Sequence, residues 1–209
     1  VAEDIPLTFL HEDEHIVVVD KPAGLVVHPG AGHRSGTLVH ALLARCELRF
    51  PEISDRVGLV HRLDKDTSGV LLVTKHPDAL DRYSALFAER RTEKSYLAIV
   101  RGKPRDDNGK MDTAYGRHPF NRGKFSSKVT KGKQALTTWQ VLSRGQVASL
   151  LDVKIHTGRT HQIRVHLADH GHPVVGDSLY GDGLQRPQRP AARAEYEALF
   201  QLGRQALHA

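Results

Sequence analysis

Hydrophobic residues gather along this chain in short runs, a pattern that predicts strands more often than helices. The run IVVVD at 16–20 is β-branched and apolar, and the turn-forming residues 21–24 follow it, so we predict a buried strand that ends in a turn. Similar runs predict a short strand at 25–28 and another, VLLVTK, at 70–75. Between them, apolar residues three and four positions apart predict a helix over 36–46.

The second half of the chain shows the same mixture. Pro77 begins a predicted helix, and SYLAIV at 95–100 predicts a strand. The runs TTWQVL and ASLLDVKI predict a hairpin that turns over 143–145. We expect Thr160 to cap a helix that ends at Gly171, and we expect a short surface helix at 192–202.

Strands outnumber helices and the two do not alternate regularly, which favours the α+β class with a mixed, largely antiparallel sheet and flanking helices. A length of 209 residues suits one large domain, so we treat 1–209 as a single domain. The single cysteine, Cys46, excludes a disulfide framework and a Cys-based zinc site, and it favours a reducing compartment. Because no apolar run has membrane-spanning length and the start does not resemble a signal peptide, we expect a cytoplasmic protein without a membrane partner. We also expect a monomer.

Charge changes this picture by suggesting a partner. The formal net charge is +6 and the sequence pI is about 9.5, which favours a polyanion such as nucleic acid. The segment 117–133 has no Asp or Glu but contains Arg117, Arg122, Lys124, Lys128, Lys131 and Lys133. A solvated lysine-rich loop is one interpretation of this run. The basic character of the whole chain favours phosphate contact, and we expect the four lysines to contact the phosphates of a nucleic acid.

The stretch HRLDKDTSG at 61–69 places one carboxylate, Asp64, between Arg62 and Lys65. It lies between two strand-like runs, where a rigid scaffold often presents a reactive group. Three interpretations are open: a solvated, salt-bridged turn, a ligand cluster for a cation, or a carboxylate kept ionised so that it can attack a substrate.

A second stretch, HEDEH at 11–15, matches the HExxH pattern of zinc hydrolases. That chemistry needs both histidines one turn apart on a stable helix. Here the pattern continues directly into the predicted strand at 16–20, so the two imidazoles would not converge. We therefore expect no metal site, and a zinc hydrolase is the weakest of the functional hypotheses.

The stretch HRLDKDTSG resembles the catalytic motif of the RluA/RluD family of pseudouridine synthases, H-R-L-D-x-x-T-S/T-G. Further blocks that resemble this family follow in the family's order, from about residue 13 to the end of the chain. These blocks are DKPAGLVVHPG at 20–30, KSYLAIVRG at 94–102, GKQALTTW at 132–139, TGRTHQIRVHLA at 157–168 and VVGDSLYG at 174–181. The resemblance implies the family's catalytic fold, with a central cleft.

The resemblance also implies roles for single residues. Asp64 matches the family's nucleophile, Tyr96 its active-site tyrosine, and Arg164 the basic partner of the aspartate, which we expect within hydrogen-bonding distance of Asp64. Arg62 matches the residue that fills the space left by the flipped nucleotide. The implied activity is isomerisation of uridine to pseudouridine in structured RNA, with large-subunit ribosomal RNA the best guess and no cofactor.

Two departures from the family pattern are expected to matter. Family members often carry a small RNA-binding domain before the first block, and their chains usually run on past the residue that matches Ala209, whereas this chain has neither extension. A basic RNA-binding module without catalysis is the alternative hypothesis. The presence of Asp64, Tyr96 and Arg164 together argues against it.

Overall fold

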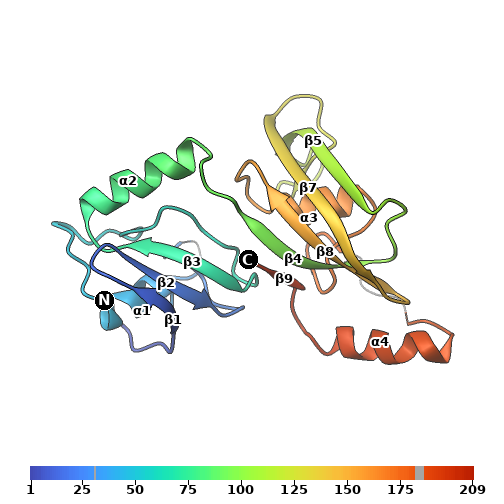
Figure 1. Ribbon diagram of the computed structural model, residues 1–209, viewed down its shortest axis with the longest axis horizontal. Coiled ribbons are helices and arrows are strands. Elements are labelled where there is room, and N and C mark those ends of the chain that lie inside the picture. Colours follow the sequence, from blue (N-terminus) through green and yellow to red (C-terminus); the bar gives the residue numbers. More distant parts are fainter. Residues whose placement is uncertain (31, 182–185) are drawn as a thin grey trace. The chain divides into compact units, whose positions relative to one another are not determined.

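The computed structural model describes residues 1–30, 32–181 and 186–209, which divide into two compact units. Unit 1 comprises residues 1–92 with Ala209, and unit 2 comprises residues 93–208. Each unit has its own β-sheet (Figure 1). The single catalytic domain over 1–209, and the cleft expected with it, stay predictions.

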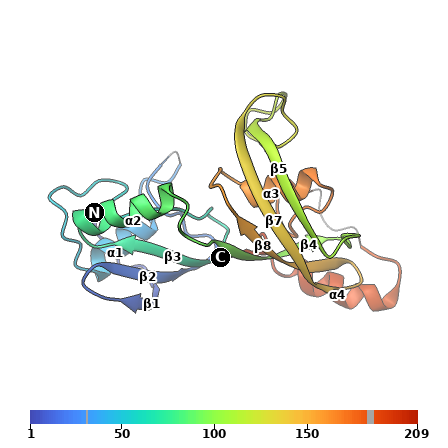
Figure 2. The ribbon, with the colours of Figure 1, turned by 45° about the horizontal axis from the view of Figure 1, so that its top comes forward.

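Unit 1 is built on a three-stranded antiparallel sheet in the order β1-β2-β3. The central strand is the predicted β-branched run, and its side chains Val17 and Val19 are fully buried. Figure 2 shows α2 beside β3, which it contacts. The elements of this unit are β1 Thr8–Glu12, β2 Ile16–Lys21, α1 Leu38–Arg45, β3 Gly69–Thr74 and α2 Pro77–Ala88.

The predictions for β2, β3, α1 and α2 are confirmed, whereas the strand expected at 25–28 is wrong. That segment forms one isolated bridge, between Val26 and Thr37. Its carbonyl groups accept hydrogen bonds from the beginning of α1, from Leu38 N–H to Val26 at 2.8 Å and from Val39 N–H to Val27 at 3.1 Å. The carbonyl groups of this segment therefore accept hydrogen bonds from the first N–H groups of a helix, which would otherwise be unpaired, and the segment does not join a sheet.

Unit 2 is built on a six-stranded antiparallel sheet in the order β6-β5-β7-β8-β4-β9. The pair β5–β7 extends towards a loop at its far end (Figure 2). The elements of this unit are β4 Ser95–Arg101, β5 Asn108–Arg117, β6 Phe125–Ser126, β7 Lys133–Arg144, β8 Ala148–Ile155, α3 Gln162–Asp169, α4 Pro190–Phe200 and β9 Leu207–His208.

The predicted hairpin is the β7–β8 pair, and the expected strand at 95–100 is β4. Helix α3 is confirmed, but its N-cap is His161 rather than Thr160. His161 has φ +58°, in the left-handed region of backbone conformation that residues other than glycine rarely adopt. Its side chain makes no capping hydrogen bond. Strand β5 was not predicted, because its sequence NGKMDTAYGR has no sustained apolar alternation.

The core of unit 2 lies between the sheet and α3. Side chains from alternate positions of the strands, including Trp139 and Val153, meet Ile163 and Leu167 of the helix. Ile163 and Leu167 therefore lie on the face of α3 that packs on the sheet, and the α+β class is confirmed. Within the described residues, no helix combines the length and apolar character needed to cross a bilayer.

Candidate active site

The loop that carries Asp64 has an inward and an outward side. Leu63, Thr67 and Ser68 are buried, whereas the side chains of Arg62, Lys65 and Asp66 are exposed and Asp64 is half-buried. The backbone turns at Asp64, whose carbonyl oxygen accepts a hydrogen bond from Thr67 N–H at 3.2 Å. Apolar and hydroxyl side chains thus anchor a loop in which the side chains of Arg62, Lys65 and Asp66 are exposed.

The side chain of Lys21 anchors this loop through the backbone of Lys65. It is fully buried, and its ammonium group donates to the carbonyl oxygens of Pro22 at 2.8 Å, Leu25 at 2.9 Å and Lys65 at 2.9 Å. Gly24 N–H donates to the same Lys65 carbonyl at 2.9 Å. An ammonium group has three protons, so these carbonyls can satisfy a buried charge completely. The turn after β2 is thereby fixed to the residue next to Asp64.

Both ends of the loop are also held. His61 Nε2 accepts a hydrogen bond from Leu72 N–H at 2.9 Å, and its ring stacks on Phe87 with centroids 4.8 Å apart. At the other end, Gly69 has φ +118°, and a side chain there would collide with the backbone of Ala209. Ala209 exchanges hydrogen bonds with the backbone on both sides of this glycine.

In unit 2 the conspicuous ionic feature is a buried pair between Arg164 of α3 and Asp177. The guanidinium group donates from Nε to Oδ2 at 2.7 Å and from Nη2 to Oδ1 at 3.0 Å, which is a two-pronged arrangement. The N–H groups of Leu179 and Tyr180 also donate to Oδ1. Burial alone would raise the pKa of Asp177, but the bonds from Arg164 and from these two N–H groups hold it below its ordinary value of 3.8.

The ring of Tyr180 connects this pair to the basic segment. The Arg164 guanidinium carbon lies 5.2 Å from the centroid of the ring, and the Lys124 ammonium nitrogen lies 6.0 Å from it. The Tyr180 hydroxyl accepts a hydrogen bond from Phe125 N–H at 3.1 Å and lies 2.9 Å from Nδ1 of His161. The beginning of α3 and strand β6 are therefore joined through one side chain.

The structure places the residues of the expected active site as follows. Asp64 and Arg62 lie in the loop of unit 1, Tyr96 is half-buried on β4, and Arg164 is buried on α3. Arg164 forms an ion pair with Asp177, which sequence reasoning had not singled out. The pairing of Arg164 with Asp64, and the roles assigned to Asp64, Tyr96 and Arg164, stay predictions.

The basic segment forms one part of the wall of a cavity of about 500 Å³ in unit 2, of a size that suits a small ligand. The side chains of Lys128, Lys131 and Lys133 are exposed, and within the part of the chain that the structure describes no carboxylate pairs with them or with Lys124. This distribution suits a polyanion, and RNA contact by the four lysines stays a prediction. The cavity is lined by Tyr115, Gly116, Phe125, Gly132, Lys133, Gly158, Arg159 and Thr160.

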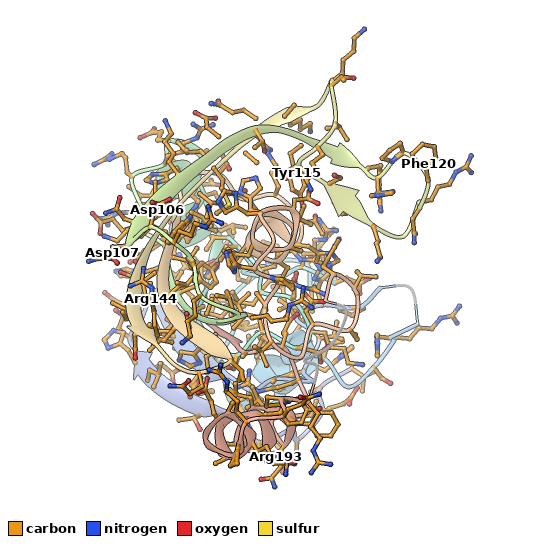
Figure 3. The ribbon with its side chains drawn as sticks, turned by 90° about the vertical axis from the view of Figure 1, so that its right-hand side faces the viewer. Asp106, Asp107, Tyr115, Phe120, Arg144 and Arg193 are labelled. Carbon is orange, nitrogen blue, oxygen red and sulfur yellow. The ribbon has the colours of Figure 1, made fainter. Side chains whose placement is uncertain are left out.

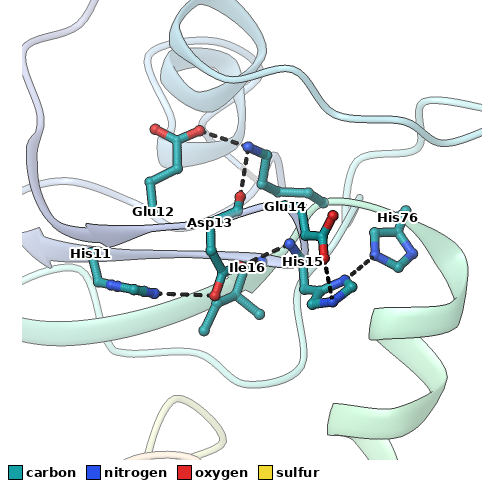
Figure 4. A network of polar contacts seen from close by, with 8 residues as sticks. His11, Glu12, Asp13, Glu14, His15, Ile16 and His76 are labelled. Carbon is teal, nitrogen blue, oxygen red and sulfur yellow. Dashed lines mark hydrogen bonds and ion pairs between the residues drawn. The ribbon is translucent and has the colours of Figure 1, made fainter.

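The HEDEH stretch does not form the helix that a zinc hydrolase needs. His11 and Glu12 lie in β1, and the two histidines contact different partners (Figure 4). Nε2 of His11 is 3.1 Å from Asp13 Oδ2, whereas Nδ1 of His15 is 2.9 Å from Nε2 of His76. Glu12, which would be the general base, forms an ion pair with Lys75 at 2.7 Å. The stretch is a strand end stabilised by local polar contacts.

Two residues of this region were missed by sequence reasoning although signals for them exist. Lys21 is a charged residue close to the apolar run at 16–19 and directly before a proline. Asp177 is an acid that follows the apolar pair Val174 and Val175 after a single glycine. A charged group inside an apolar stretch indicates burial with a partner.

Comparison with known proteins places these features in a family. Residues 15–169 match the family model described as RNA pseudouridylate synthase. An uncharacterised RNA pseudouridine synthase of Aquifex aeolicus is 50% identical over 182 residues, covering 86% of this chain and 57% of that protein. The ribosomal large subunit pseudouridine synthase D of Nitrosomonas europaea is 45% identical over 210 residues, covering 100% and 58%. The chain thus spans a little over half the length of these relatives.

A solved structure gives the same result for the fold. Human RNA pseudouridylate synthase domain containing 1 is 29% identical, with a TM-score of 0.74, covering 100% of this chain and 78% of that one. The family model, the relatives and this structure agree, so the chain belongs to the RNA pseudouridylate synthase family.

Proposed function

We propose that this chain carries the catalytic domain of a pseudouridine synthase that isomerises specific uridines in large-subunit ribosomal RNA. The observation that carries the proposal is the anchored loop of Asp64, which lies within the residues that match the family. The ribosomal substrate is supported by the printed names of relatives from Nitrosomonas europaea and Pseudomonas aeruginosa, 45% and 44% identical, both called ribosomal large subunit pseudouridine synthase D.

The reaction requires no group from outside the RNA. The bond between ribose C1′ and uracil N1 breaks, the base turns, and a bond forms between C1′ and C5. The proton displaced from C5 is balanced by the proton that N1 gains, and no electrons are transferred. We therefore propose a reaction without a cofactor or a metal, in which Asp64 supplies nucleophilic catalysis.

The remaining residues would support the carboxylate and the base. A carboxylate enclosed with a uracil tends to protonate, and an opposite charge from Arg164 would keep it ionised. Tyr96 would stack on the uracil, and its hydroxyl would assist removal of the C5 proton. The target must leave its stack, at a cost of a few kcal/mol, and Arg62 would offset part of this by filling the vacated space.

RNA binding would rest on Lys124, Lys128, Lys131 and Lys133, because contacts to phosphates supply affinity without selecting a sequence. We propose further that the protein acts as a monomer in the cytoplasm, where a ribosomal RNA substrate is available. An RNA-binding module without catalysis is the alternative that the experiment below must separate from this proposal.

The test uses large-subunit ribosomal RNA labelled with tritium at C5 of uridine. Isomerisation exchanges that tritium with water, so the proposal expects stoichiometric release and pseudouridine at a few discrete positions. Tight RNA binding with no release would overturn the proposed activity and favour the non-catalytic module.

A further inference from the structure

A single aromatic side chain, Phe120, stands at the outer end of the loop between β5 and β6 (Figure 3). Its exposed fraction is 94%, the highest of any large hydrophobic residue described except the N-terminal Val1. It contributes nothing to the core of unit 2. One exposed hydrophobic residue is ordinary in itself, so the surroundings of Phe120 decide its meaning.

The loop holds Phe120 outward by a set of internal hydrogen bonds. His118 N–H donates to the carbonyl of Lys124 at 3.0 Å, which closes the loop, and Lys124 N–H donates to the carbonyl of Asn121 at 3.0 Å. Nδ1 of His118 accepts from the N–H groups of Phe120 and Asn121, each at 3.2 Å. Binding through such a preorganised loop costs little additional conformational entropy.

The charged residues nearest to Phe120 in the sequence are all cations. Arg117, Arg122 and Lys124 lie within four residues of it, and the sequence from 117 to 133 contains no acid. Arg117 packs over Phe125, with its guanidinium carbon 4.2 Å from the ring centroid, and donates to the carbonyl of Arg122 at 3.1 Å. None of these three cations is paired with a carboxylate in the described parts of the chain.

An aromatic ring among unpaired cations matches the chemistry of single-stranded nucleic acid. The face of a base stacks on the ring, and the phosphates on either side contact the cations. A protein partner would instead be expected to need a wider apolar patch around the ring. We infer that Phe120 stacks on an unpaired nucleobase of the RNA while Arg122 and Lys124 contact the adjoining phosphates, an inference that rests on the proposed function.

The nucleotide bound here is a different one from the target uridine. The target is assigned to Tyr96 on β4, and β4 is separated from β5 by β8 and β7 in the sheet. With strands about 4.8 Å apart, this separation already amounts to about 14 Å before the length of the loop is added. Phe120 would therefore hold a second position of the substrate and contribute to the choice of site.

The test compares variants by fluorescence anisotropy with two probes, a single-stranded 12-nucleotide oligouridylate and a 12-base-pair RNA duplex. In Phe120→Leu the residue stays apolar but loses its ring, and in Phe120→Trp it keeps a ring. Phe200→Ala is the matched control, because Phe200 is an exposed phenylalanine of the same unit, 66% exposed on α4.

We expect Phe120→Leu to weaken binding of the single strand by about 5- to 100-fold, and Phe120→Trp to preserve it. Binding of the duplex, in which bases are already stacked, should change less than about twofold in every variant. The salt dependence of binding should not change, because the number of phosphate contacts is the same. Phe200→Ala should behave like the wild type with both probes.

Two results would overturn the inference: Phe120→Leu binding the single strand as Phe200→Ala does, or Phe120→Leu losing the duplex as severely as the single strand. Tritium release by the wild-type protein, measured on the same preparation, separates this from the proposed function. An active wild type with a silent Phe120→Leu refutes the stacking role alone. An inactive wild type whose single-strand binding still depends on the ring refutes the activity and supports the stacking role.

Discussion

The ammonium nitrogen of Lys21 lies 2.9 Å from the backbone carbonyl oxygen of Lys65, 44 positions further along the chain. This bond joins the turn after β2 to the loop that presents Asp64. Because the side chain of Lys21 is fully buried, the bond operates away from water, where a charge-assisted hydrogen bond is strong and its loss is costly. The position of Asp64 therefore depends on a lysine that is remote in sequence.

Replacement of this lysine by methionine should destabilise unit 1. Lys21→Met keeps the length of the side chain but removes its hydrogen bonds to three carbonyl groups, of which that of Lys65 keeps another donor, Gly24 N–H. We expect a loss of roughly 2–3 kcal/mol in the free energy of unfolding. Urea denaturation measures it. Lys65→Met is the control, because the bond uses the backbone of Lys65 and its side chain is exposed. Equal stability of the two variants would contradict the anchoring role.

Replacement of Asp64 by asparagine should abolish isomerisation and leave the fold intact. The change preserves shape but removes the negative charge of the proposed nucleophile. We expect tritium release to fall by more than roughly 10³-fold, with RNA affinity and the unfolding midpoint near wild-type values. Asp66→Asn, which changes an exposed acid of the same loop, should retain most activity. Turnover in pure Asp64→Asn protein would refute the assignment of the nucleophile.

The elements that were correctly predicted are those whose sequence alone determines them. The β-branched run of β2 and the amphipathic spacing of α2 are visible in short windows, because local pattern and final burial agree there. The segment at 25–28 has equally apolar residues, but its backbone serves α1 instead of a sheet. Strand β5 shows the opposite case, since its polar residues become a strand through pairing with β7.

The candidate site could be predicted only as far as the resemblance reached. The motif identified Asp64, but nothing in residues 61–69 indicates that Lys21 supports them from another segment. In the same way Arg164 was identified, whereas its partner Asp177 is 13 positions away and beyond the end of α3. Contacts between such segments depend on the fold, and a single sequence does not contain that information.

Acid should destabilise unit 2 through His166. This side chain is buried, and its two ring nitrogens lie 2.8 Å from the Thr137 hydroxyl and 3.0 Å from the Thr113 hydroxyl. Burial lowers its pKa from 6.5 to about 4, against the opposing effect of Asp169 and Asp112 and with a small further lowering by His170. The unfolded chain thus binds one more proton between these values, so stability is lost as the pH falls from about 6.5 towards 4.

The slope of this loss is at most about 1.4 kcal/mol per pH unit for one proton. His166→Gln keeps hydrogen-bonding groups but does not titrate, so its stability should depend less on pH between 4 and 6.5. His156→Gln, which changes an exposed histidine of the same unit, should retain the wild-type slope. Thermal unfolding at a series of pH values gives the comparison, and identical slopes for all three proteins would exclude His166 as the cause.

Neutralising the four lysines of the basic segment should weaken RNA binding without changing the modified uridine, because phosphate contacts carry affinity and little sequence information. With all four as glutamine, the slope of log affinity against log salt should fall by up to about 3, at roughly 0.7 per contact with a single strand. A control variant in which four other cations of unit 2 are replaced should lose less RNA affinity; its positions are Lys103, Lys110, Lys154 and Arg193. A changed target uridine, or an unchanged salt slope, would count against the prediction.

Replacement of Asp177 by asparagine should be among the most damaging polar changes in unit 2. Asn keeps the shape and can still accept from Leu179 and Tyr180, but the Arg164 guanidinium loses the buried carboxylate of Asp177, at a cost of about 3–5 kcal/mol in unfolding free energy. Adding Arg164→Met should restore part of that stability, because the double variant also lacks the buried guanidinium charge that Asp177 balances. The pKa of Asp177 in the folded protein lies below 3.8, so the contribution of the pair is complete above pH 3.8 and disappears as the pH falls through the folded value. Urea denaturation of the single and double variants gives the coupling, and a double variant no more stable than Asp177→Asn alone would show that the buried charge of Arg164 is not the cause of the loss.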